Sequence, residues 1–325
     1  MTDTWQIQDR TGNRTDVLHR HTMVQFHQTG MSISWLSTRD GASGCSAGAR
    51  TMQRISLSFP APGYWHATFR NPPINLIDPD MIEEMFDLVG RLESDPDVKV
   101  IVFASADPDF FLAHYDVLAD KARIAAMQPG PTGYHPWIDV MIRLARAPIV
   151  SIASIRGRAR GAGSEFALAC DLRFASAEKA VLGQFEVGLG AVPGGNPMAR
   201  LAGLAGRGRT LEIVLGADDF PGPLAERYGY VTRALQDDEL EAFVDRFARR
   251  IAGFDKRALA ETKSIVDDVT LPPDTVFPPV LAQFFQSTAR DETRARSASL
   301  LRAGLQRRSA VEFDLGRNVA AKHDA

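Results

Sequence analysis

The sequence predicts an α/β fold, in which short apolar strands alternate with amphipathic helices. Two observations support this prediction. The patterned part of the chain opens with two alternating runs, residues 55–59 and 64–69, which have the period of half-buried strands. Further on, the apolar run 148–155 leads through a glycine-rich segment, residues 157–163, into an uninterrupted apolar block. That order indicates a buried strand followed directly by a buried helix.

The composition excludes several classes of protein. The chain has 325 residues, of which 45% are hydrophobic and 24% charged, as in ordinary soluble globular proteins. A formal net charge of −3 gives no reason to expect binding to nucleic acid or to an anionic membrane surface. No apolar run approaches the ~20 residues that span a bilayer. Because the two cysteines indicate neither a disulfide framework nor a zinc site, we expect a cytoplasmic protein without a metal.

The first 51 residues differ from the rest of the chain. Thr, Ser and Gly are frequent in residues 1–51, and no strand or helix period persists there. We therefore expect a flexible N-terminal extension. The patterned part begins at Met52.

The elements after the two opening strands follow from local signals. Residues 71–75 are expected to form a loop. Asp78 and Pro79 then mark a helix start, because Asp is a favoured cap and Pro suits the first helical position. The apolar face of that helix repeats at helical spacing and consists of Met81, Met85, Leu88 and Leu92. Residues 98–104 read as the next buried strand.

The later part of the chain is mostly helical by the same criterion. Residues 121–132 form a variable-looking connection. Apolar stripes then predict helices around residues 137–144, 198–204 and 240–251, and the segments 211–216, 259–265 and 277–305 are expected to be helical as well. The first of these is expected to pack on the sheet.

The glycine-rich junction is the strongest candidate for chemistry. Its core reads Gly161-Ala162-Gly163-Ser164-Glu165. The first N–H groups of a helix lack intrahelical partners, and together with the positive helix end they stabilise a developing oxyanion. Glu165 lies three residues beyond Ala162, so both fall on one side of the first turn. A carboxylate is costly to bury, which makes Glu165 a candidate catalytic group.

A purely structural explanation of the same residues stays open at this point. Gly161 and Gly163 would then only allow close packing, and Glu165 would only favour the helix dipole. Nucleotide-binding motifs are excluded. No Gly-Lys-Ser/Thr follows the glycines, and Phe166 occupies the last glycine position of a dinucleotide fingerprint.

The junction resembles the second oxyanion-hole motif of the crotonase (enoyl-CoA hydratase/isomerase) superfamily, Gly-Gly-Gly-x-Glu-Leu-Ala-x-x-x-Asp. Residues 161–171 read Gly-Ala-Gly-Ser-Glu-Phe-Ala-Leu-Ala-Cys-Asp. Residues 182–195 are similar to the family run Phe-Gly-x-Pro-Glu-x-x-x-Gly-x-x-Pro-Gly. Residues 107–116 are similar to the first oxyanion-hole motif, Phe-x-Ala-Gly-x-Asp. The resemblance covers about residues 53–310.

The resemblance implies a spiral of repeated strand-strand-helix units with a C-terminal helical region. On this basis we expect residues 52–250 to form the crotonase-like core with the active site. Residues 251–325 are expected to cover the site and to make subunit contacts. Members of the family assemble as trimers or pairs of trimers, so the expected assembly is a homotrimer or a dimer of trimers.

The motif match also implies an oxyanion hole. Its first donor is the N–H of Tyr115, and its second is the N–H of Ala162, between Gly161 and Gly163. The chain departs from the family at two positions, because His114 and Ala162 replace the usual glycines. We expect His114 to be a structural loop residue; the alternative is a general acid or base.

The remaining catalytic positions are two glutamates. Glu165 and Glu186 stand where hydratases of this family carry theirs. Hydration needs one carboxylate to activate water and one carboxylic acid to protonate C2. The pair therefore favours an enoyl-CoA hydratase acting on a 2-enoyl-CoA, with no cofactor beyond the coenzyme A of the substrate thioester. The alternatives are an isomerase, another acyl-CoA hydrolase or C–C cleaving enzyme, and a catalytically silent protein that binds CoA esters.

Overall fold

The computed structural model describes residues 5–8, 14–17 and 52–321 of the chain. The chain divides into two units, Met1–Ala49 and Arg50–Ala325. The described part of the first unit is an antiparallel strand pair, β1 (Trp5–Gln8) and β2 (Arg14–Val17). The rest of the expected extension, within residues 1–51, lies outside the described residues, so its flexibility stays a prediction.

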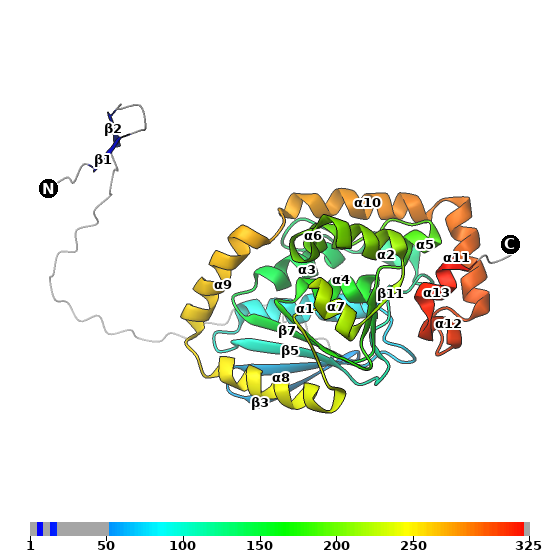
Figure 1. Ribbon diagram of the computed structural model, residues 1–325, viewed down its shortest axis with the longest axis horizontal. Coiled ribbons are helices and arrows are strands. Elements are labelled where there is room, and N and C mark those ends of the chain that lie inside the picture. Colours follow the sequence, from blue (N-terminus) through cyan, green and yellow to red (C-terminus); the bar gives the residue numbers. More distant parts are fainter. Residues whose placement is uncertain (1–4, 9–13, 18–51, 322–325) are drawn as a thin grey trace, which may run out of the picture. The chain divides into compact units, whose positions relative to one another are not determined.

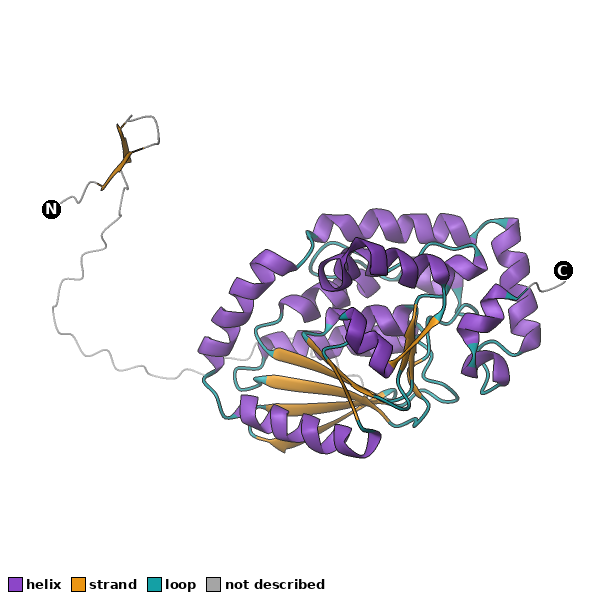
Figure 2. Ribbon diagram, in the orientation of Figure 1, coloured by secondary structure: helices purple, strands orange, loops and turns teal. Residues whose placement is uncertain are grey.

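The second unit is built on a six-stranded sheet with the order β12-β9-β7-β5-β4-β3 (Figures 1 and 2). Its strands are β3 (Ile55–Ala61), β4 (Tyr64–Phe69), β5 (Val100–Ser105), β7 (Val150–Ile155), β9 (Leu172–Ser176) and β12 (Arg233–Leu235). The β3–β4 pair is an antiparallel hairpin, and all the other neighbours in this sheet are parallel. Parallel strands alternating with helices confirm the predicted α/β class.

Both faces of this sheet are covered by helices (Figure 1). The side chains of β5 point alternately to the two faces of the sheet. On one face, Ile101 and Phe103 pack in the core cluster with α1 (Pro79–Ser94), α3 (Pro136–Arg146) and α4 (Ala162–Ala169). On the other face, Val100 and Val102 pack with α8 (Asp237–Ala252). The start of α1 is as predicted, because the Asp78 side chain accepts a hydrogen bond from the N–H of Met81 at 2.8 Å.

A second sheet of four strands has the order β11-β10-β8-β6. It consists of β6 (Phe110–Leu112), β8 (Arg158–Arg160), β10 (Val181–Gly183) and β11 (Asp219–Pro221). The presence of β8 corrects the expectation that the glycine-rich segment joins strand and helix directly. The strands β8, β10 and β11 have three residues each, which is too short for a period to be visible in the sequence.

The helices beyond the sheets differ in detail from the expected ones. The two helices expected around 198–204 and 211–216 form one element, α6 (Pro197–Gly216), with a kink at Gly206, whose φ is +76°. The expected stretch 277–305 is divided into α10 (Phe277–Thr288) and α11 (Asp291–Ala303). The remaining helical elements are α2 (Lys121–Ala126), α5 (Glu186–Leu189), α7 (Gly222–Tyr228), α9 (Lys256–Thr270), the 3₁₀ turn η1 (Asp274–Val276), α12 (Ala310–Phe313) and α13 (Leu315–Ala320).

The C-terminal helices α11, α12 and α13 lie together at one end of the unit (Figure 1). The division of the chain into two units sets no boundary near residue 250, so the functional division into 52–250 and 251–325 stays a prediction. None of the described helices has the length and apolar character needed to cross a membrane.

Candidate active site

The second sheet brings the three motif segments to one place. Its strands β6, β8 and β10 are neighbours and run parallel, so their carboxyl ends meet at the same edge. His114 and Tyr115 follow β6, Gly161 and Ala162 follow β8, and Glu186 follows β10. Residues separated by more than 70 positions in the sequence are thereby assembled around one point.

The loop after β6 presents the N–H of Tyr115. The carbonyl of His114 accepts a hydrogen bond from the N–H of Ile77 at 2.9 Å, and the N–H of Asp116 donates to the carbonyl of Ile77 at 2.9 Å. In a trans peptide the N–H and the preceding C=O point in opposite directions, so the Tyr115 N–H points away from Ile77. This N–H makes no hydrogen bond within the described part of the chain.

The helix after β8 presents the N–H of Ala162. Ala162 is the first residue of α4, and its cap, Gly161, has φ +48° and ψ −124° and contributes no side-chain hydrogen bond. The first N–H groups of the helix are therefore without intrahelical partners. A β-carbon at Gly161 would lie 2.6 Å from Oε1 of Glu186, and one at Gly163 would collide with the carbonyl of Leu112. Gly161 therefore allows the side chain of Glu186 to lie close to the backbone, and Gly163 allows α4 to pack closely against β6.

Glu165 is buried in α4, with only 3% of its surface exposed. Its Oε1 accepts a hydrogen bond from the N–H of Gly195 at 2.8 Å, and its Oε2 accepts one from Nε1 of Trp137 at 3.1 Å. Burial raises the pKa of Glu165 to about 7, and the two donors oppose this rise by stabilising the charged form. The spacing of Trp137 in the apolar stripe of α3 favoured packing on the sheet, with a substrate wall as the alternative; Trp137 does line the pocket, but its hydrogen bond to Glu165 was not foreseen.

Glu186 is the first residue of α5 and is also buried. Its Oε2 has no hydrogen-bond partner among the described residues. Burial raises the pKa of Glu186 to about 8, and the negative charge of Glu165 contributes to the rise. The two carboxyl groups therefore differ: Glu165 is held by two donors, and Glu186 has an unpartnered oxygen.

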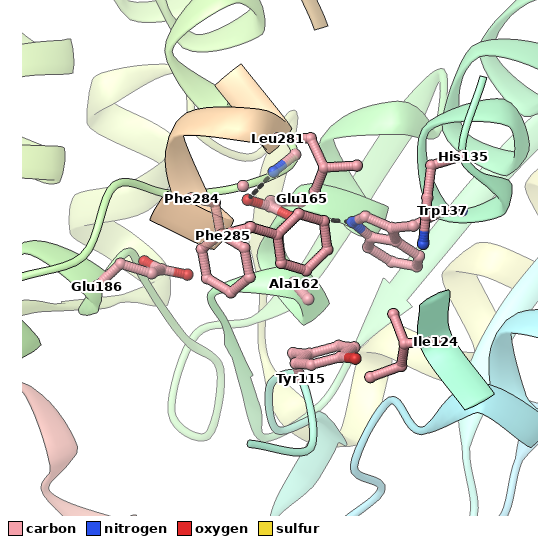
Figure 3. A pocket seen from close by; sticks show the side chains of 12 residues that line it. Tyr115, Ile124, His135, Trp137, Ala162, Glu165, Glu186, Leu281, Phe284 and Phe285 are labelled. Carbon is pink, nitrogen blue, oxygen red and sulfur yellow. Dashed lines mark hydrogen bonds between the residues drawn. The ribbon is translucent and has the colours of Figure 1, made fainter. Parts of the chain in front are cut away.

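Glu165, Glu186, Tyr115 and Ala162 line one pocket. In Figure 3, Glu165, Ala162 and Tyr115 lie in the middle of this pocket, and Glu186 reaches toward them from one side. The pocket has a volume of about 40 Å³, and Leu281, Phe284 and Phe285 of α10 line it. An adjoining cavity of about 610 Å³ shares Tyr115 and Glu186 with it and extends along α11.

Two further polar atoms in the pocket wall were not foreseen from the sequence. The hydroxyl of Tyr115 and Nε2 of His135 are buried without a hydrogen-bond partner among the described residues. His135 caps α3, because its Nδ1 accepts from the N–H of Trp137 at 3.2 Å. A nitrogen that accepts carries no proton, so the proton of the neutral ring is on Nε2, which is a free donor at the pocket.

His114 is turned away from this chemistry. Its ring is 1% exposed, its Nδ1 lies 2.8 Å from the carbonyl oxygen of Tyr115, and its Nε2 lies 2.9 Å from Oε1 of Glu312. Both ring nitrogens are engaged inside the protein, which is the geometry of a loop-holding residue.

The described residues contain no group of three or more His, Cys, Asp or Glu side chains placed to hold a metal ion. What the pocket offers is two backbone donors and two buried carboxyl groups whose pKa values lie near neutrality. Such a set can hold a developing oxyanion and move two protons.

Comparisons with known proteins agree with this geometry. The sequence profile of the enoyl-CoA hydratase/isomerase family matches residues 63–299. A short-chain-enoyl-CoA hydratase of Clostridium acetobutylicum is 30% identical over 184 residues, which are 56% of this chain and 69% of the relative. The crotonyl-CoA hydratase of Syntrophomonas wolfei is 30% identical over 201 residues, 61% of this chain and 75% of the relative.

The fold has close counterparts among solved structures. The crystal structure of a candidate enoyl-CoA hydratase from Streptomyces avermitilis matches with 40% sequence identity and a TM-score of 0.80. The match covers 86% of this chain and 100% of the chain in that structure. An enoyl-CoA hydratase structure from Mycobacterium avium subsp. paratuberculosis, at 24% identity and a TM-score of 0.67, shares the fold. The family profile spans most of the unit that carries the pocket. This chain therefore belongs to the enoyl-CoA hydratase/isomerase family, in the crotonase superfamily.

Proposed function

We propose that this protein is a hydratase that adds water across the double bond of a 2-enoyl-CoA thioester. The observation that carries the proposal is the pair of buried carboxyl groups, Glu165 and Glu186, in the pocket that Tyr115 and Ala162 also line. The names of the bacterial relatives, both hydratases of acyl-CoA thioesters, support the same reaction.

The thioester carbonyl is the group that the backbone donors bind. Addition of water at C3 moves electrons through the double bond onto the thioester oxygen, which becomes an enolate. The N–H groups of Tyr115 and Ala162 stabilise that negative charge without a metal, and loss of one such donor typically lowers the rate by ~10²–10³. The positive end of the α4 dipole acts in the same direction.

The difference between the two glutamates assigns their roles. Glu165, whose carboxylate accepts hydrogen bonds from Gly195 and Trp137, is the group that ionises first and accepts a proton from water. Glu186, with a pKa of about 8, keeps its proton and delivers it to C2. The water oxygen bonds to C3, C2 gains the proton of Glu186, and Glu165 takes one proton from the water. The pair of glutamates therefore carries one proton before and after the reaction, on Glu186 at the start and on Glu165 at the end.

The substrate and surroundings follow from the same proposal. The reaction requires no cofactor, because coenzyme A enters as part of the thioester. The large apolar cavity beside the pocket has room for an acyl chain. A homotrimer or a dimer of trimers stays a prediction from the family resemblance, and a cytoplasmic location stays a prediction from the cysteine content.

The alternative reactions of the family use the same oxyanion hole. An isomerase moves a double bond with one carboxyl group, so two buried carboxyl groups favour hydration over isomerisation. Hydrolysis or carbon–carbon cleavage of an acyl-CoA, and binding without turnover, are distinguished from hydration by the product.

Turnover in ¹⁸O-labelled water, with a series of 2-enoyl-CoA and 3-enoyl-CoA thioesters, tests the proposal by product mass. A hydratase incorporates one labelled oxygen into the acyl product. An isomerase leaves the acyl mass unlabelled, and a hydrolase releases free coenzyme A. If wild-type protein consumes substrate without label entering the acyl chain, the hydratase assignment is wrong.

A further inference from the structure

The loop that presents the first oxyanion donor is connected to the C-terminal end of the chain. Nε2 of His114 lies 2.9 Å from Oε1 of Glu312, which belongs to α12 and is 198 positions away in the sequence. Both side chains are buried, with exposed fractions of 1% and 0%.

The protonation of this pair follows from its partners. Nδ1 of His114 faces the carbonyl oxygen of Tyr115 at 2.8 Å, and a carbonyl only accepts, so Nδ1 carries a proton. Nε2 faces a carboxylate, which also accepts. Burial lowers the pKa of His114, but the charge and hydrogen bond of Glu312 outweigh it and leave the pKa raised. The pair is therefore an imidazolium ion bound to a carboxylate.

Glu312 is in turn fixed by its own neighbours. Its Oε1 accepts the N–H of Gln306 at 2.6 Å, and its backbone carbonyl accepts Nη1 of Arg160 at 2.7 Å. The side chain of Gln306 returns to the loop, where its Nε2 donates to Oδ1 of Asp116 at 2.6 Å. The residues on both sides of Tyr115 are thus bound to one short C-terminal segment, 306–312.

We propose that Glu312 is a positioning residue of the active site, which acts through His114 to hold the N–H of Tyr115 toward the substrate carbonyl. The proposal rests on the proposed function, in which that N–H is an oxyanion donor. The contact between His114 and Glu312 is well placed for this role. The carbonyl of His114 and the N–H of Tyr115 belong to the same peptide unit, and the His114 ring binds the carbonyl of Tyr115, which follows that N–H.

The expected effect is on rate more than on binding. An oxyanion donor acts most strongly on the charged transition state, and misplacement by about 1 Å can lower a rate ~10²-fold. The Glu312→Ala variant should therefore lower kcat by about 10- to 100-fold and change KM by less than about threefold. Glu312→Gln, which keeps an oxygen to accept from Gln306 and His114, should restore most of the rate.

The experiment compares kcat and KM of purified full-length variants on crotonyl-CoA. Glu292→Ala, an exposed glutamate of α11, is the matched control. The His114→Gly variant and the His114→Gly/Glu312→Ala double variant complete a double-mutant cycle. Because Glu312 acts through His114, the double variant should be no slower than the slower single variant. The double variant removes both charges of the pair, so neither is left unpaired in the interior. If Glu312→Ala does not fold, the double variant is measured in its place. A kcat of the double variant equal to that of wild type would then overturn the proposal.

Two other outcomes would also overturn it: a kcat of Glu312→Ala within twofold of the Glu292→Ala control, or losses in the two single variants that multiply in the double variant. If wild-type protein turns over no acyl-CoA, the proposed function fails separately. Hydrogen exchange by mass spectrometry then decides the positioning role. Faster exchange of residues 113–117 in Glu312→Ala than in Glu292→Ala supports it, and equal exchange refutes it.

Discussion

Replacement of Glu186 by Gln should make the protein more stable at high pH while it removes the catalytic acid. Glu186 is buried, and its Oε2 has no partner within the described structure. Ionisation of this group in the folded protein is costly, which is why its pKa is raised from an ordinary value of 4.5 to about 8. The proposed mechanism therefore uses a group that opposes folding whenever it is charged.

The magnitude follows from the size of that rise. A group whose pKa is higher in the folded state contributes stability that is fully present below the unfolded value and lost as the pH rises through the folded value. The rise from 4.5 to about 8 is about 3.5 pH units, which corresponds to roughly 5 kcal/mol over the whole range. Between about pH 6 and pH 8, the free energy of unfolding of wild type should fall by about 2 kcal/mol relative to Glu186→Gln.

Urea unfolding at matched protein concentration, at several pH values from about 6 to 9, measures this difference. The amide of Gln adds its own cost of burial, but that cost does not depend on pH, so the slope with pH is the decisive quantity. Glu292→Gln, which removes an exposed carboxylate of α11, is the control. A difference between wild type and Glu186→Gln that is the same at pH 6 and pH 9 would refute the reasoning.

Three other predictions concern the same pocket. The pH profile of kcat/KM should be bell-shaped. Protonation of Glu165 removes the base below about pH 7, and ionisation of Glu186 removes the acid above about pH 8. A profile that is flat from pH 6 to pH 9 would contradict the roles assigned to the pair. Trp137→Phe removes one of the two donors that lower the pKa of Glu165, so the acidic limb of the pH profile should move to higher pH. If this limb does not move, the hydrogen bond from the indole has no effect on the pKa of the base. Tyr115→Phe keeps the backbone donor, so kcat on crotonyl-CoA should stay within about threefold of wild type, whereas a loss of ~10² or more, the scale of a missing general acid, would mean that the hydroxyl takes part in the chemistry.

Much of the local structure and the family could be recognised from the sequence. The Asp78 cap and the apolar face of α1 depend only on neighbouring residues, so both were predictable. The junction of Gly161 to Glu165 was equally visible, because a glycine motif followed by a buried-looking helix is a contiguous signal. The position of a carboxylate at a helix start made Glu165 a candidate catalytic group from the sequence alone.

Only the tertiary structure decided how these pieces meet. Strands of three residues such as β8 and β10 show no period, so their pairing, which brings Ala162 and Glu186 together, has no local signal. The hydrogen bond of Trp137 to Glu165 depends on how α3 packs against α4. The contact of His114 with Glu312 joins positions 198 residues apart, and both residue types are usual on protein surfaces. Burial makes the partner of each group decisive, because a charged or polar group removed from water must find its hydrogen bonds inside the protein, and the folded chain alone determines where they are.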